Sequence, residues 1–161
     1  MESSPRSREG ETASHIAIIL VTLAQFIFFT GFHKYIAWPI TGPDGSVTRL
    51  SMLTDNYFTW LPIMITASIL VILASIVMIF HDEYRFRRTI QIGFNIIGIA
   101  VSISLVSIFP FDFSVIPNAT AVDVVPIVVT VFFILLAVFY GVTALVMFGK
   151  LRSYAAKQDS G

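Results

Sequence analysis

Neutral polar side chains recur along an otherwise apolar segment at positions 89–109. Four residues of this segment are separated by four, three and four positions: Gln91, Asn95, Gly98 and Ser102. This spacing places them on one face of a helix. The chemistry of their uncharged amide and hydroxyl groups is hydrogen bonding, so the face predicts either bridges between helices or the lining of a pore or ligand site.

Other apolar segments carry polar groups at a similar depth. Five residues fall in one layer, roughly 9 to 14 Å from the inner boundary at about 1.5 Å per helical residue: Gln25, Ser75, Asn95, Tyr140 and Thr143. Hydrogen bonds between membrane helices contribute about 0.6 kcal/mol each on average, so the layer is expected to fix helix packing. The alternative is a ligand site or pore along the face of Gln91, Asn95 and Ser102.

The ionisable residues give little support for catalysis. His81, Asp82 and Glu83 are consecutive, and neighbouring residues at a helix end do not face one another. The sequence shows no serine or cysteine paired with a histidine, and no phosphate-binding glycine loop. We therefore expect no catalytic residues, and an enzyme embedded in the membrane is only the third alternative.

Histidines could ligate haem if two imidazoles faced each other at one depth. His15 and His81 share the inner edge, but they lie at helix ends, where histidines are ordinarily solvated. At the outer edge, His33 and Lys34 have acidic neighbours without a metal-ligand spacing, and we interpret them as a solvated rim. The chain has no cysteine, which excludes disulfides and thiol-bound metals. We expect no metal and no cofactor.

Four apolar segments must position these side chains. Of the 161 residues, 56% are hydrophobic and 12% are charged, a composition typical of membrane proteins. A helix needs about 20 apolar residues to cross about 30 Å of hydrocarbon. The predicted spans are 15–35, 57–80, 89–109 and 124–148. Because no ionisable residue lies deep in any of them, a proton-coupled carrier, a voltage sensor and a carboxylate-ringed pore are disfavoured.

These spans predict an all-α membrane protein, a left-handed up-down-up-down bundle of four helices with short connections. The helical domain would cover 15–149, flanked by polar tails at 1–14 and 150–161. The run TGPDGS at 41–46 indicates a turn. Phe109-Pro110 is expected to end the third helix, and Asp112 is expected to cap its exit.

Basic residues predict the orientation of the bundle. Of the ten Lys and Arg residues, eight lie in the two tails and the 81–88 connection, and only Lys34 and Arg49 lie on the other side. By the positive-inside rule, both termini are cytoplasmic. Five residues are expected to anchor the cytoplasmic surface, in addition to Arg6 and Arg8: Arg85, Arg87, Arg88, Lys150 and Arg152. Four aromatic residues are expected at the outer headgroups: Tyr35, Trp38, Tyr57 and Trp60.

Small side chains form a strip on the fourth span, where Ala137, Gly141 and Ala144 recur at helical spacing. Such strips allow two backbones to approach closely. We expect a neighbouring helix at this strip, either from the same chain or from another subunit.

The favoured function is that of a non-enzymatic subunit or assembly partner in a membrane complex, because apolar faces, small-residue strips and neutral polar bridges are what helix association requires. The alternative is a small channel or carrier for a neutral or lipid-like solute. Expected partners are the lipid bilayer and either another membrane protein or a second copy of this chain. The formal net charge of zero gives no indication of nucleic-acid binding.

Overall fold

A computed structural model describes residues 5–81 and 83–158. Asp82 lies outside these ranges, and the side chains of Arg6 and Arg8 also lie outside the described part of the protein. Four long helices dominate the fold: α1 (Pro5–Gly31), α2 (Asn56–Phe80), α3 (Tyr84–Ile108) and α4 (Ala119–Gln158).

Each of the four helices contains a stretch that is long and apolar enough to cross a membrane. The prediction of four helices that are long and apolar enough to span a membrane is therefore confirmed. The helices extend beyond the predicted limits, most of all α1, which begins at Pro5, and α4, which continues to Gln158. The hydropathy pattern marks only the apolar part of a helix, whereas backbone hydrogen bonding continues into polar sequence until a residue interrupts it.

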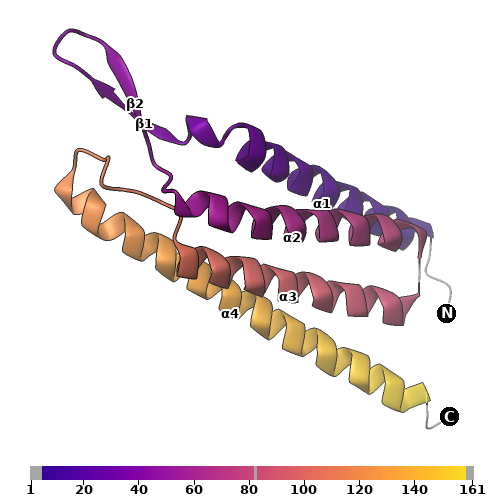
Figure 1. Cartoon of the computed structure of the whole chain (residues 1–161). Coiled ribbons are helices and arrows are strands. Elements are labelled where there is room, and N and C mark those ends of the chain that lie inside the picture. The colour runs from indigo at the N-terminus through magenta and orange to yellow at the C-terminus, as the bar shows by residue number, and fades with distance from the viewer. Residues whose placement is uncertain (1–4, 82, 159–161) are drawn as a thin grey trace.

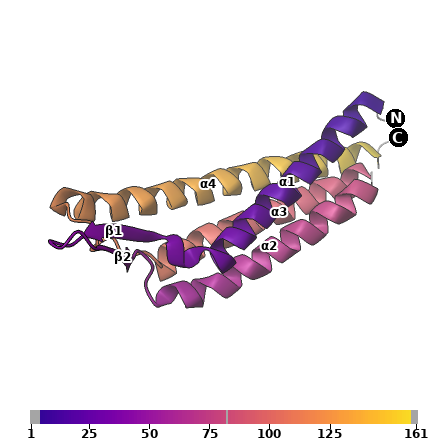
Figure 2. The same ribbon diagram turned by 90° about the horizontal axis from the view of Figure 1, so that it is seen from above.

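The helices lie side by side in the order of the chain (Figure 1). The packed pairs are α1 with α2, α2 with α3, and α3 with α4, whereas α1 and α4 have no comparable contact. Figures 1 and 2 show both termini at one end of the helices and the connections between α1 and α2 and between α3 and α4 at the other. We call this second end the hairpin end.

The connection from α1 to α2 contains elements that the sequence did not predict. After the short 3-10 helix η1 (His33–Tyr35), strands β1 (Ala37–Thr41) and β2 (Val47–Ser51) pair antiparallel. The turn predicted at 41–46 joins them, with Gly45 at a φ of +78° that favours glycine. The fold is thus four helices plus a two-stranded hairpin that projects from the hairpin end (Figure 1).

The connection from α3 to α4 is tied to the residues that follow this hairpin. Leu53 and Phe111 form an isolated antiparallel bridge, and the Asp112 amide donates to the Met52 carbonyl over 2.8 Å. The helix α3 ends at Ile108, where Phe109 takes a left-handed φ of +42° before Pro110. The expectation that Asp112 caps this exit is wrong, because its carboxylate instead accepts hydrogen bonds from the amide and hydroxyl of Ser114.

The hydrophobic core lies in the half of the helices nearest the hairpin. Its buried members are Tyr57, Trp60 and Met64 of α2 and Leu105 of α3. Phe29 of α1 packs edge-on against Trp60, with ring centroids 5.5 Å apart. Tyr57 and Trp60 are 1% and 2% exposed, so both side chains face the protein core at this end of the helices.

The rest of the buried interior is unusually polar. Within the described ranges, the buried polar side chains are His15, Ser68, Ser75, Asn95 and Ser102. His15 was expected to be solvated at a helix end, but it lies within α1 and is only 6% exposed. Buried hydroxyl and amide groups need hydrogen-bond partners. Several of these groups lie next to a space between the helices.

Candidate ligand cavity between the helices

A cavity of about 350 Å³ lies between the four helices, on the side of the interior nearest the hairpin end. Its walls draw on α1 from Thr22 to Phe29, on α2 from Trp60 to Val71, on α3 from Phe94 to Leu105 and on α4 from Phe133 to Tyr140. This volume falls within the range of small-molecule sites, about 300 to 1,000 Å³.

Asn95 presents an amide group to this cavity from α3. Its side-chain nitrogen donates to the Gln91 carbonyl over 2.8 Å and lies 3.7 Å from the Met147 sulfur. Both contacts use the nitrogen, and no residue in the described ranges donates to the Asn95 side-chain oxygen. Asn95 is only 8% exposed, so this oxygen is an acceptor available to a molecule in the cavity.

Two further donors in the lining of the cavity also lack protein partners. Trp60 lines the cavity, and its buried indole Nε1 has no hydrogen-bond partner among the residues that the structure describes. The Ser102 hydroxyl, on a side chain 3% exposed, likewise makes no hydrogen bond to this part of the chain. By contrast, the Ser68 hydroxyl contacts the Met64 sulfur at 3.3 Å. Buried donors without partners are costly, and a bound polar group would remove this cost.

The α4 side of the cavity depends on a close approach of α3 and α4. Gly98 lies directly against the ring of Tyr140, and a Cβ on Gly98 would be only 2.7 Å from Tyr140 Cε2. The absence of a side chain at Gly98 therefore lets the Tyr140 ring lie across α3 and form part of the wall. Thr22 and Gln25 supply polar groups from α1.

The lining of the cavity carries no formal charge. Its lining holds Thr, Gln, Trp, Ser, Asn and Tyr side chains together with aliphatic and phenylalanine side chains, and it includes no Asp, Glu, Lys, Arg or His. No group of three or more potential metal ligands occurs in the described ranges. A molecule here would be held by apolar contact and a few hydrogen bonds to neutral groups.

The predicted face on 89–109 and the predicted layer together hold seven polar residues, and the cavity brings four of them together: Gln25, Asn95, Ser102 and Tyr140. The other three lie elsewhere. Ser75 is fully buried and its hydroxyl has no partner among the described residues, Gln91 accepts from Arg88 over 3.1 Å, and Thr143 donates to the Phe139 carbonyl. The sequence interpretation missed Thr22, Trp60 and Ser68, although the four-residue spacing from Trp60 through Met64 to Ser68 marks one face of α2.

The small-residue strip of α4 meets a helix of the same chain. A Cβ on Gly141 would lie 4.0 Å from Ile99 Cδ1 of α3, and Ala137 and Ala144 are half-buried on the same helix. The strip therefore contributes to the packing of α3 with α4, where the helices also approach at Gly98.

The predicted basic anchors lie at the end of the molecule that holds the termini. The Arg88 guanidinium lies 5.3 Å from the centroid of the Tyr84 ring, and Tyr84 in turn contacts Tyr154 of α4. The side chains of Arg85, Lys150 and Arg152 are exposed, and Arg87 is half-buried. These residues surround the start of α3 and the end of α4, away from the cavity.

Comparisons of the chain with protein-family models, with curated proteins and with solved structures give no match.

Proposed function

We propose that this chain is a non-enzymatic membrane protein that binds a small neutral or lipid-like solute in the cavity between its helices, as a carrier or small channel would. In this proposal the four apolar helices cross the bilayer in alternating directions, and both termini lie in the cytoplasm. The excess of basic residues in the tails and the 81–88 connection supports this orientation.

One observation carries the binding proposal. Polar groups from four different helices line one cavity, and several of them, including Trp60 Nε1 and the Asn95 side-chain oxygen, have no partner in the described parts of the chain. In hydrocarbon, water is scarce and an unpaired polar group costs several kcal/mol, estimated at about 2 to 7. A solute that carries a hydroxyl or carbonyl would pair with these groups.

The lining also limits the chemistry of the solute. Without a charged side chain in the wall, an ionic solute would lack a counter-charge in a medium of low dielectric constant. Phe29, Phe94 and Phe133 offer apolar surface next to the polar groups. The ligand should therefore be neutral and amphiphilic, with one or two hydrogen-bonding groups and an apolar part.

The proposal can be tested on the purified full chain in a mild detergent. We expect native mass spectrometry to show the protein with a bound small molecule, which solvent extraction would release as an uncharged compound. Thr22→Phe, which fills the cavity from α1, should abolish this adduct. Val21→Phe is a matched control, because Val21 is 67% exposed and points away from the interior. Loss of the adduct in both variants, or in neither, would contradict the proposal.

A second candidate function is that of a subunit in a membrane complex, and one observation favours it. The helices α1 and α4 have no contact comparable to that of the other neighbouring helices, and α4 exposes large apolar side chains such as Leu135, Phe139 and Leu145. A partner helix could close this side of the cavity and bury part of α4. The same purification separates the two functions, because a stoichiometric protein companion supports the subunit and a chain with only a small molecule supports the binding protein.

A further inference from the structure

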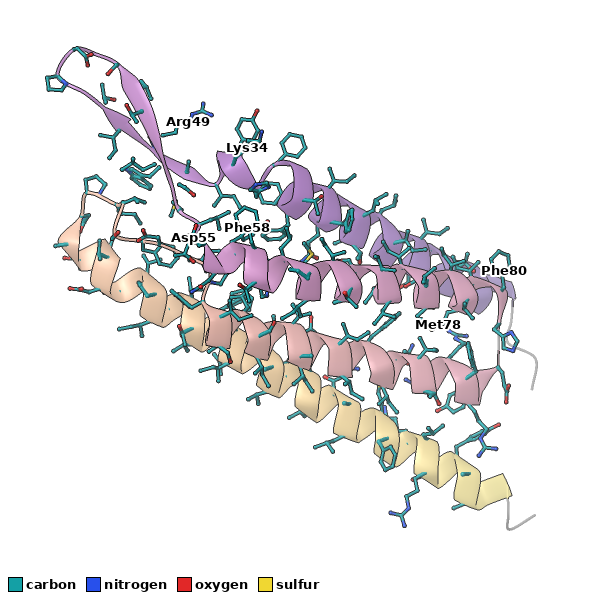
Figure 3. All side chains as sticks on the ribbon, viewed as in Figure 1. Lys34, Arg49, Asp55, Phe58, Met78 and Phe80 are labelled. Atoms are coloured by element: carbon teal, nitrogen blue, oxygen red, sulfur yellow. The ribbon has the colours of Figure 1, made fainter. Side chains whose placement is uncertain are left out.

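A second cavity, of about 330 Å³, lies at the junction of the hairpin with α1 and α2. Figure 3 shows its labelled residues, Lys34, Arg49, Asp55 and Phe58, grouped around this junction. They come from η1, β2 and the beginning of α2, so three separate elements build the site. None of these residues lines the cavity between the helices.

The cavity collects the basic side chains of the hairpin end. Lys34 and Arg49 are the only Lys and Arg residues in the two connections at this end, 32–55 and 109–118, and both line the cavity. Neither forms a hydrogen bond or an ion pair with the residues that the structure describes. Both side chains are exposed, and with Asp55 as the one carboxylate in the same lining they leave an excess of positive charge that attracts an anion.

Further donors face the same region. The Thr54 hydroxyl is buried without a hydrogen-bond partner in the described chain, and Thr54 lines this cavity. The first turn of α2 follows directly, and its Tyr57 and Phe58 amides already donate to the Thr54 and Asp55 carbonyls. The helix dipole still places partial positive charge at this N-terminus, which favours anions.

We propose that this cavity binds the phosphate group of a ligand at the membrane surface. Arg49 can offer two parallel N–H donors to phosphate oxygens, and Lys34 adds a second positive charge. Asp55 is the one carboxylate in the lining, and it is placed to pair with an ammonium group on the same ligand, as in a zwitterionic headgroup. The site lies where the span of α1 ends at Gly31 and that of α2 begins at Asn56, which is the level of lipid phosphates.

The test compares phosphatidylethanolamine and diacylglycerol as ligands of the full chain in detergent, by native mass spectrometry. We expect the phospholipid to bind and diacylglycerol, which lacks the phosphate, to bind at least about tenfold more weakly. The double substitution Lys34→Gln with Arg49→Gln should remove this preference. Lys150→Gln is the matched control, since it removes the same kind of charge at the other end of the molecule.

A further variant and a competition experiment complete the test. Thr54→Val keeps the shape of the side chain, so it should weaken phospholipid binding without lowering thermal stability. Competition with inorganic phosphate at millimolar concentration shows whether the bound phosphate group belongs to a lipid or is free. Displacement of the lipid indicates a site for free phosphate. Retention of the lipid indicates a site for the lipid headgroup. Equal binding of diacylglycerol and phospholipid, or an unchanged preference in the folded double variant, would overturn the proposal.

Discussion

Gly98 of α3 lies under the aromatic ring of Tyr140 of α4, so closely that a Cβ at Gly98 would be 2.7 Å from Cε2 and 2.9 Å from Cζ. This contact sets the separation of the two helices and holds the tyrosine in the cavity wall. Gly141, on the same interface, has a very different surrounding, because its nearest neighbour would be 4.0 Å away.

We predict that Gly98→Ala destabilises the protein although alanine favours helices. Forcing a methyl group against the Tyr140 ring costs about 1 to 3 kcal/mol of folding free energy. This cost matches or exceeds the gain of about 1 kcal/mol from the higher helix propensity of alanine. Gly141→Ala should be neutral or stabilising, because its methyl group fits. Thermal unfolding in detergent measures both, and Tyr140→Leu should rescue Gly98→Ala. Equal stability of the two alanine variants would contradict the close contact.

The Tyr57 hydroxyl donates to the Phe29 carbonyl and thereby ties α2 to the last turn of α1. A helix leaves its last carbonyls without amide partners, so this bond satisfies a group that would otherwise be buried and unpaired. We expect Tyr57→Phe to lower the free energy of unfolding by about 1 to 3 kcal/mol. Tyr35→Phe should have no effect, because Tyr35 is 61% exposed. A similar loss in both variants would assign the effect to something other than this bond.

Asn95→Leu should separate packing from binding. The variant loses one weak interhelical contact, worth about 0.6 kcal/mol, so its stability in detergent should change little. It also loses the free acceptor in the cavity, so the affinity for a neutral alcohol should fall between about twofold and tenfold. Thr143→Val is the control, since the Thr143 hydroxyl donates only to its own helix at Phe139. Unchanged affinity in Asn95→Leu would remove Asn95 from the site.

Acid should weaken the turn at Asp112 in the connection from α3 to α4. Hydrogen bonds from the Ser114 hydroxyl and then from its amide hold the pKa of Asp112 below the ordinary value of 3.8. The pKa of Asp112 is lower in the folded protein than in the unfolded chain. The ionised carboxylate therefore stabilises the fold fully above the unfolded-state pKa, and this stabilisation is lost as the pH falls through the folded-state pKa. We expect the Ser114 amide resonance to titrate below pH 3.8. In Ser114→Ala the titration of Asp112 should move upward, and a native titration at or above 3.8 would contradict this turn.

The helices could be predicted because a membrane span is a local property of composition. The hairpin could not, although its turn was predicted at 41–46. Pro39 lies inside β1 opposite Arg49, and a proline within a run argues against a strand. It is tolerated here because the sheet has only two strands, and an edge position does not require every amide to pair.

The candidate site could be predicted in part because depth along a helix follows from counting residues. Counting placed Gln25, Asn95 and Tyr140 in one layer, and these side chains do share the cavity. It also placed Ser75 and Thr143 there, but depth says nothing about how a helix is rotated about its axis. Rotation depends on contacts such as that of Gly98 with Tyr140, which join residues from different helices and leave no local sequence pattern.

The central claim, that the cavity between the helices binds a neutral amphiphile, is tested most directly by the fluorescence of Trp60. The chain has two tryptophans, so Trp38→Phe leaves Trp60 as the sole emitter, in the cavity wall and only 2% exposed. We predict that 8-bromo-1-octanol quenches this emission to a saturating level, that 1-octanol competes, and that adding Thr22→Phe abolishes the effect. Quenching that rises linearly with concentration and is equal with and without Thr22→Phe would contradict a binding site in this cavity.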